Sequence, residues 1–379
     1  IELDRIHRPQ MSWETIAIVG LISVLSLLVQ FLLQGADTEG NIGMMHLGHV
    51  VIGFILMIAI YRMDYSVLGK YSRVVAIFFL IVMTINIFYF GFMINGARNY
   101  LNIGGLFISL TPVMLLYIPL FGGVLYSYRG KGYGTLWQLI LWAGVPIWIT
   151  FKIPSVMTSA ILLFSMAALF SFAVAKGWYQ VSRRWTLIVM WSVLILAPIV
   201  RISVVFLSGA PSYQVDRLMS WITRDEQMNY TANRLREIIM NSSFVGKNEI
   251  ARQIVSQKLP DVNADYVLAG IMSMYGVAVA GIVIALLIGL IYKIFHISLR
   301  QKNQLGMMIG LGCGMVFLMQ TITNVMVIFN LLPMTGIVLP LFSHGGTGIA
   351  VSYILLGIVL SIYRYKDISC ERKIAKGYL

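Results

Sequence analysis

Two neighbouring aspartates are the residues of this chain best suited to chemistry. Asp261 and Asp265 lie where a polar segment gives way to a long apolar run. A carboxylate at such a boundary is partly desolvated, and desolvation raises its pKa towards the working range of a general base. The alternative is an exposed Asp near the start of a helix, which it stabilises through the helix dipole. Position alone leaves both interpretations of Asp265 open.

Four basic residues are candidates for binding an anion. Arg201 lies beside Pro198 near the end of an apolar run, where it would bind a headgroup or pyrophosphate, or extend to the interface. Lys152 sits between two apolar runs and has the same two interpretations. Arg98 and Arg217 are flanked by Asn, Tyr and Gln, so solvated loop charges are the simpler explanation for them.

Residues 343–348 (SHGGTG) form a glycine-rich segment at the start of the last apolar run. Glycines let backbone amides approach a phosphate, but in membrane helices they more often permit close packing. Because histidine in water titrates near neutral pH, His344 in this segment is a candidate pH-sensitive and binding residue. The sequence contains no zinc-ligand spacing, P-loop or nucleophile elbow.

The composition is that of an integral membrane protein. Of the 379 residues, 59% are hydrophobic and 11% are charged, against about 25% charged in a soluble domain. Because about 20 apolar residues cross the hydrocarbon core, the long apolar runs are interpreted as spanning helices. The ten runs cover residues 13–33, 44–62, 74–93, 107–127, 134–151, 155–176, 184–207, 266–295, 305–330 and 340–364.

The basic residues predict the orientation of these spans. If the N-terminus is cytoplasmic, the short outer loops hold only Arg98 and Lys152, as the positive-inside rule requires. The inner segments then hold Arg5, Arg8, Arg62, Lys70, Arg73, Arg129, Lys131, Lys176, Arg183, Arg184, Lys293, Arg300, Lys302, Arg364, Lys366, Arg372, Lys373 and Lys376. Anionic lipid headgroups therefore account for the net charge of +13, and no nucleic acid partner is needed.

We therefore expect an all-α polytopic membrane protein with about ten transmembrane helices and both termini cytoplasmic. Residues 1–379 form a single domain, and a large outer loop, 208–264, precedes the eighth span. Loops of this length are commonly functional. Within it, residues 226–240 are expected to form a surface helix whose Leu235, Ile238 and Ile239 face the lipid or the protein.

Residues 259–267 (LPDVNADYV) and 331–336 (LLPMTG), among other motifs, resemble segments of the SEDS family, the RodA, FtsW and SpoVE proteins. Residues 95–104 (NGARNYLNIG) resemble the family's NGARRWI-N-G loop, and 259–267 (LPDVNADYV) resemble its LPEAHTDFIF segment. The clearest motif match is in the C-terminal part, where it includes Gln320, Asn324, residues 331–336 (LLPMTG) and residues 340–347 (PLFSHGGT). Residues 213–221 (YQVDRLMSW) and 244–247 (FVGK) also match, so the resemblance covers most of the chain from about residue 90, in order.

The resemblance implies a peptidoglycan glycosyltransferase that polymerises lipid II at the outer face of a bacterial cytoplasmic membrane. It implies that Asp265 is the catalytic carboxylate, which deprotonates the acceptor 4-hydroxyl, with cationic groups such as Arg98, Arg201 and Arg217 offsetting charge on the pyrophosphate. A divalent cation such as Mg²⁺ would serve the same purpose. It also implies a partner, a class B penicillin-binding protein. The cellular processes that the resemblance implies are the determination of cell shape, cell division or sporulation.

The sequence also departs from the family pattern. The family's Glu and Lys in the fourth span are absent, with Thr111 to Met114 at the former motif and Tyr117 at the Lys position. Ser155 replaces the Asp of another motif, and Asn263 replaces the His before the catalytic Asp. Two alternatives therefore stand beside the enzyme: a non-catalytic scaffold for the transpeptidase, and a lipid II flippase. A flippase should line a deep polar path, whereas the candidates here gather on the outer side.

Overall fold

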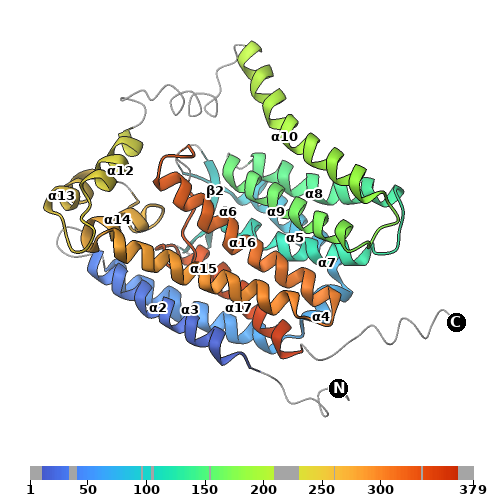
Figure 1. Ribbon diagram of the computed structural model, residues 1–379, viewed down its shortest axis with the longest axis horizontal. Helices are drawn as coiled ribbons and strands as arrows, with labels where there is room; N and C mark the ends of the chain where they lie inside the picture. Colours follow the sequence, from blue (N-terminus) through green and yellow to red (C-terminus); the bar gives the residue numbers. More distant parts are fainter. Residues whose placement is uncertain are drawn as a thin grey trace.

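A computed structural model describes residues 11–33, 41–94, 97–103, 106–152, 155–208, 230–259, 261–333 and 336–365. Its long helices are α2 (Trp13–Leu33), α3 (Ile42–Arg62), α5 (Ser72–Ile85), α7 (Tyr117–Ser127), α8 (Gly134–Lys152), α9 (Val156–Ala175), α10 (Arg183–Ser208), α15 (Val277–Leu299), α16 (Gln304–Ile328) and α17 (Gly346–Arg364). The shorter helices are α4 (Tyr65–Lys70), α6 (Leu110–Met114), α12 (Tyr230–Asn241), α13 (Glu249–Lys258) and α14 (Val267–Tyr275). Figure 1 shows α12, α13 and α14 gathered at the opposite end of the molecule from α4.

The helical membrane architecture is confirmed. In the described part of the chain, eight helical segments are long and apolar enough to cross a membrane, and each coincides with a predicted span. The two remaining predicted spans correspond to α8, whose apolar stretch Gly134–Thr150 is shorter, and to α10. Both chain termini lie outside the described residues, so their cytoplasmic location stays a prediction.

Small residues let the central helices approach closely, as is common in membrane bundles. A Cβ added to Gly312 of α16 would lie 2.7 Å from the backbone of Pro119 in α7. One added to Gly122 of α7 would lie 2.7 Å from the carbonyl oxygen of Met308. The α7–α16 pair therefore forms a tightly packed centre against which the other helices are arranged.

The basic loops converge at one end of this bundle. Arg129 donates to Gln304 Oε1 at 2.6 Å, which joins the α7–α8 loop to the start of α16. Asn303 donates to the Tyr65 hydroxyl at 3.0 Å, and an ion pair joins Lys293 to Glu14. The predicted inner segments thus meet in space. That this end faces the cytoplasm remains a prediction from the positive-inside rule.

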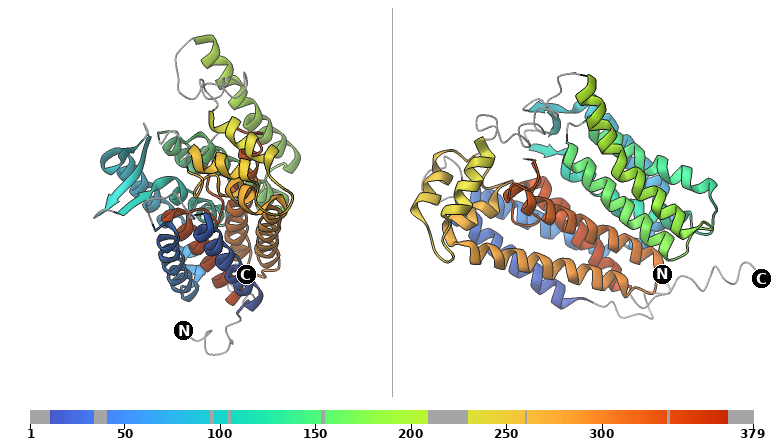
Figure 2. Two further views of the ribbon diagram at one scale, coloured as in Figure 1. Left: turned by 90° about the vertical axis from the view of Figure 1, so that its left-hand side faces the viewer. Right: turned by 45° about the horizontal axis from the view of Figure 1, so that its top comes forward.

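The all-α architecture includes one short segment of a different structure. A π-helical turn, η1 (Asn86–Phe90), is followed by an antiparallel sheet in the order β1 (Phe92–Ile94), β2 (Ala97–Ile103) and β3 (Leu106–Ser109). Figure 2 shows this sheet projecting from the side of the helical body. Aromatic and β-branched residues favour strands, and Tyr100 and Ile103 on β2 with Phe107 and Ile108 on β3 supply them here.

The predicted span 266–295 is two helices rather than one. Gly276 separates α14 from α15 and has φ +91°, a conformation that favours glycine. A Cβ there would lie 2.7 Å from the carbonyl oxygen of Phe244. The backbone amides of Val277 and Ala278 donate to the carbonyls of Ser243 and Phe244, so the outer loop caps α15. The segment 242–246 therefore fixes the helix break.

The outer-loop helix expected at 226–240 is confirmed from Tyr230 onwards as α12. Leu235 and Ile238 are fully buried and Ile239 is partly buried, so this apolar face packs on protein. The second outer helix, α13, was not predicted; Asn248 caps it by accepting hydrogen bonds from the amides of Ile250 and Ala251.

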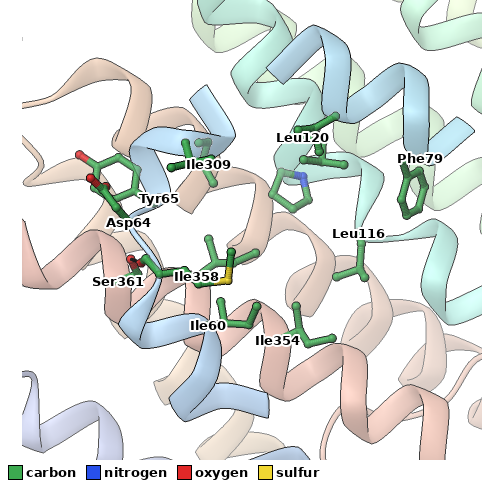
Figure 3. A pocket seen from close by; sticks show the side chains of 14 residues that line it. Ile60, Asp64, Tyr65, Phe79, Leu116, Leu120, Ile309, Ile354, Ile358 and Ser361 are labelled. Atoms are coloured by element: carbon green, nitrogen blue, oxygen red, sulfur yellow. Dashed lines mark hydrogen bonds between the residues drawn. The ribbon is translucent and has the colours of Figure 1, made fainter. Parts of the chain in front are cut away.

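A cavity of about 210 Å³ lies at the basic end, among α3, α4, α5, α7, α16 and α17 (Figure 3). Its walls are mainly apolar, with Ile60, Leu116 and Ile358 among them, and Asp64 is its one ionisable carboxylate. The cavity adjoins the last turn of α3, whereas the aspartates singled out above adjoin the bundle's other end. Its lining consists mainly of hydrocarbon side chains and not of groups for acid–base chemistry.

Candidate active site

Asp265 lies on a tight turn that leads into α14. The turn begins at Asp261, whose φ of +56° is unusual for a residue with a side chain. The carbonyl of Asp261 accepts from the amides of Ala264 at 3.0 Å and Tyr266 at 3.2 Å. This closed turn, residues 261–266, places Asp265 just before the helix begins.

Asn324 of α16 holds this turn from one side. Its Nδ2 donates to the carbonyl of Asp265 at 2.9 Å and to the carbonyl of Ile337 at 2.6 Å. The Asn324 side chain is buried, and its bond to Ile337 is buried while its bond to Asp265 is partly buried. The amide therefore links the Asp265 turn to the loop before α17, residues 336–345.

The same two segments are joined from the other side. The amide of His344 donates to the carbonyl of Asn263 at 2.7 Å. Gln30 of α2 donates to that same carbonyl at 2.9 Å and to the carbonyl of Phe342 at 2.8 Å. Within the second loop, the Ser343 hydroxyl accepts from the amide of Leu339 at 2.7 Å. Both loops are thus held in a single arrangement.

The environment of Asp265 raises the pKa of its carboxyl to about 7. Burial is the larger cause, and the negative charge of Asp261 adds to it. Oδ2 lies close to Gly336, because a Cβ added there would sit 3.0 Å from it. Tyr100 of β2 also lies near, and its pKa is raised by burial and then by Asp265 and Asp261. A carboxyl with this pKa can exchange a proton near neutral pH.

Three histidines lie close together: His46 and His49 of α3, and His344 of the loop 336–345. The rings of His46 and His344 have centroids 5.9 Å apart, and those of His49 and His344 are 5.4 Å apart. Burial, and then the nearby His49, lower the pKa of His344. The Nδ1 atoms of all three rings are buried and have no hydrogen-bond partner in the described part of the chain.

Comparison with known proteins gives the family. The sequence pattern of the family described as FTSW_RODA_SPOVE, Cell cycle protein, matches residues 8–368. This chain belongs to the FtsW, RodA and SpoVE family. It is 23% identical to the peptidoglycan glycosyltransferase MrdB of Helicobacter pylori over 365 residues, which cover 94% of this chain and 92% of MrdB. It is 22% identical to stage V sporulation protein E of Bacillus subtilis over 332 residues, covering 83% and 84%.

Solved structures of this family share the fold. A chain from a peptidoglycan synthase complex matches with a TM-score of 0.77 at 18% identity, covering 95% of this chain and 99% of the other. The rod shape determining protein RodA of Thermus thermophilus matches with a TM-score of 0.65 at 15% identity, covering 95% and 98%. The resemblance predicted from the motifs is therefore confirmed for family and architecture.

This family member brings together three of the predicted site residues: Asp265, Asn324 and His344 are connected through the two loops. The basic candidates are less fully described. Arg98 lies on β2 opposite Met93, Lys152 is the last residue of α8, and Arg201 lies within α10. The side chains of these three, and all of Arg217, lie outside the described residues, so their substrate-binding roles stay predictions.

Asp261 and Asp265 are the two carboxylates that the described residues offer to a divalent cation at this site. Across the described ranges, no three His, Cys, Asp or Glu side chains come together in a way that could hold a metal ion. Asp261 and Asp265 share the turn, but a carboxylate cage for Mg²⁺ needs more oxygen ligands from protein or substrate. No reaction step is therefore assigned to a metal.

Sequence reasoning missed four residues around the site. Gln30, Ser26 and His46 lie inside apolar runs, and Tyr100 lies in the sheet. A signal for the first three was present, because polar residues inside a membrane helix are costly and usually face the bundle interior. Gln30 and Ser26 carry no charge, so they do not stand out among the ionisable residues of the sequence.

Proposed function

We propose that this chain is a peptidoglycan glycosyltransferase that polymerises lipid II at the outer face of a bacterial cytoplasmic membrane. The observation that carries this proposal is the partly buried Asp265, whose pKa of about 7 suits a general base. It occurs in a member of a family whose relatives include named peptidoglycan glycosyltransferases. Residues 1–379 would act as one membrane domain, with the outer loop 208–264 beside the site.

In the proposed reaction, the Asp265 carboxylate accepts the proton of the acceptor sugar's 4-hydroxyl. The hydroxyl oxygen attacks the anomeric carbon of the donor, and the bond from that carbon to the pyrophosphate oxygen breaks. The undecaprenyl pyrophosphate leaves with the bonding electron pair, and Asp265 later returns its proton to water. A base positioned to take the proton during the attack typically raises the reaction rate about 10²–10⁴-fold.

The leaving pyrophosphate needs positive charge nearby. Arg98, Arg201, Arg217 and Lys152 are proposed to supply it, with Asn324 and His344 shaping the sugar-binding region. The relative in a peptidoglycan synthase complex supports a further proposal, that this chain works with a class B penicillin-binding protein. Crosslinking would then follow polymerisation within one assembly.

One observation favours a second candidate function, a non-catalytic scaffold for such a transpeptidase. At the position where the family resemblance predicts a Lys, Tyr117 is fully buried and its hydroxyl donates to the carbonyl of Trp142 at 2.9 Å. This side chain faces α8 and carries no positive charge. A protein that has lost this charge can keep the fold and the partner-binding surface without the chemistry.

The test is polymerisation of purified lipid II in nanodiscs, with and without a class B penicillin-binding protein and divalent cations. We expect the wild type to form glycan strands and Asp265→Asn to lose about 10²–10⁴-fold in rate. Asp64→Asn is the matched control at the opposite end, since an amide oxygen can still accept the Ser66 amide bond that caps α4. No polymer from folded wild type with its partner present would favour the scaffold.

A further inference from the structure

Gln30 connects the two loops of the site from within a spanning helix. Its side chain is fully buried, and both hydrogens of its amide are used, one on the carbonyl of Asn263 and one on that of Phe342. These contacts join residues 233 and 312 positions apart in the sequence. A buried Gln in an apolar helix is costly unless its amide hydrogens are paired in this way, while Gln30 Oε1 has no partner among the described residues.

Ser26 and His46 continue the same set of contacts one helical turn away. The Ser26 hydroxyl lies 2.7 Å from the carbonyl of Leu341 and 2.7 Å from Nε2 of His46. A carbonyl can only accept, so the single hydroxyl hydrogen of Ser26 is donated to Leu341. His46 must then donate to Ser26, which assigns its hydrogen to Nε2. Leu341 has φ +64°, so this contact holds an unusual backbone conformation.

These bonds bear on Asp265 through its backbone. The carbonyl of Asn263 is held by Gln30 and by the His344 amide, while the carbonyl of Asp265 is held by Asn324. With both carbonyls fixed, from α2 on one side and from α16 on the other, the Cα–Cβ bond from which the Asp265 carboxylate extends is fixed too. Its burial, and so its raised proton affinity, depends on that direction.

We propose that Gln30, Ser26 and His46, the α2–α3 staple, are positioning residues that hold the Asp265 turn and the loop 336–345 in the geometry for proton abstraction. None of the three contacts the reacting atoms in this scheme; each acts through the backbone of the loops. The inference rests on the proposed function for its catalytic meaning. The positioning itself can be measured without any glycan synthesis.

The first measurement is the pH dependence of Asp265 modification by a water-soluble carbodiimide, read by mass spectrometry on protein in nanodiscs. Carbodiimide reacts with the protonated carboxyl, so the midpoint reports the proton affinity of Asp265. Among the side chains that the structure describes, the groups that face this carboxyl with charge or a titratable proton are Asp261 and Tyr100. We expect a midpoint near 7 in the wild type, and a fall of about one pH unit or more in Gln30→Met as the turn becomes hydrated.

The tautomer of His46 gives a second, sharper comparison. In His46→Gln the side-chain amide nitrogen can occupy the position of Nε2 and still donate to Ser26. In His46→Asn the shorter amide reaches only the Nδ1 position and cannot. We expect the first variant to keep the wild-type midpoint and the second to lower it. Ser23→Ala is the control, since the Ser23 hydroxyl contacts Val19 and Tyr353 in the same helical region but neither loop.

Kinetics with lipid II give the third readout. A positioning defect should lower kcat by about tenfold or more and leave KM near its wild-type value, because the geometry matters most in the transition state. An unchanged carbodiimide midpoint in Gln30→Met, or an equal shift in Ser23→Ala, would overturn the staple. If Gln30→Met fails to fold, the two His46 variants decide the matter. Wild-type protein with the expected midpoints but no polymerisation would overturn the proposed function and leave the staple standing.

Discussion

Asn324 and Asp265 are joined by a partly buried hydrogen bond in which the asparagine side chain holds the backbone, and not the carboxylate, of the aspartate. The same amide nitrogen also holds Ile337 in the loop before α17. The carboxylate is therefore left available while its attachment is fixed. This arrangement is suited to a group that must accept a proton from a bound substrate in a defined direction.

Removing the Asn324 side-chain amide should lower both the stability of the protein and its rate of polymerisation. In Asn324→Leu two carbonyl oxygens lose their donor, and each buried group left unsatisfied costs about 1–3 kcal/mol. We expect a loss of stability of roughly 2–4 kcal/mol, with a large loss of polymerisation. Thr323→Val is the matched control on α16, because the Thr323 hydroxyl bonds only to Met319 of its own helix. Thermal unfolding in detergent and lipid II turnover check the pair; equal effects would contradict the assignment.

Polymerisation should rise with pH through about 7. A general base acts only when deprotonated, and the pKa of Asp265 is about 7. The charge of Asp261 contributes to that raised value, so Asp261→Asn should move the midpoint of the pH–rate profile to lower pH while activity persists. A pH–rate series for both proteins measures the shift. A midpoint that moves to higher pH would show that the two carboxylates do not interact as described.

Stability should show the complementary dependence. The folded chain binds the Asp265 proton more tightly than the unfolded chain does, since the folded pKa is raised. Its contribution to stability is complete below the ordinary Asp pKa of about 4 and is lost as pH rises through about 7. Melting curves from pH 4 to 8 should decline over this window, and Asp265→Asn should flatten the decline. If the melting temperatures of wild type and variant fell equally with pH, this linkage would be contradicted.

Gly336→Ala should impair catalysis more than stability. The added methyl group would lie 3.0 Å from Asp265 Oδ2, closer than most such contacts, so the carboxylate must turn away. Gly336 itself is exposed, and its backbone is not in the left-handed region. We expect a fall in kcat of about tenfold or more with little change in melting temperature. Gly281→Ala is the control, because a Cβ there meets nothing within 4 Å.

Gly276→Ala should lower the stability of the folded protein. Alanine would be strained at φ +91°, and its Cβ would meet the backbone oxygen of Phe244 at 2.7 Å. Such strain costs about 1–3 kcal/mol, and the contacts that cap α15 would be displaced with it. Thermal unfolding should show the loss. Gly289→Ala in the same helix, where the added carbon is free of contacts, should be unaffected or slightly stabilised.

The sequence by itself determined the membrane class, the position of the spans and the family. Hydropathy is a local property of about 20 consecutive residues, so it can be read along the chain without knowledge of contacts. It also placed Asp265 at the boundary of a span, and the motifs around residues 259–267 and 331–347 singled out that residue. It did not predict the break at Gly276 or the sheet at 92–109, because both depend on backbone partners elsewhere.

Only the tertiary structure decided what surrounds Asp265. Its raised pKa comes from burial by segments distant in sequence, and desolvation is a property of the packed site and not of the residue type. Likewise, Ser26 and Leu341 are 315 positions apart, and no local pattern indicates their hydrogen bond. The roles of Gln30, Ser26 and His46 follow from helix packing, which brings α2 and α3 against the two loops and pairs the Gln30 amide hydrogens, the Ser26 hydroxyl and His46 Nε2.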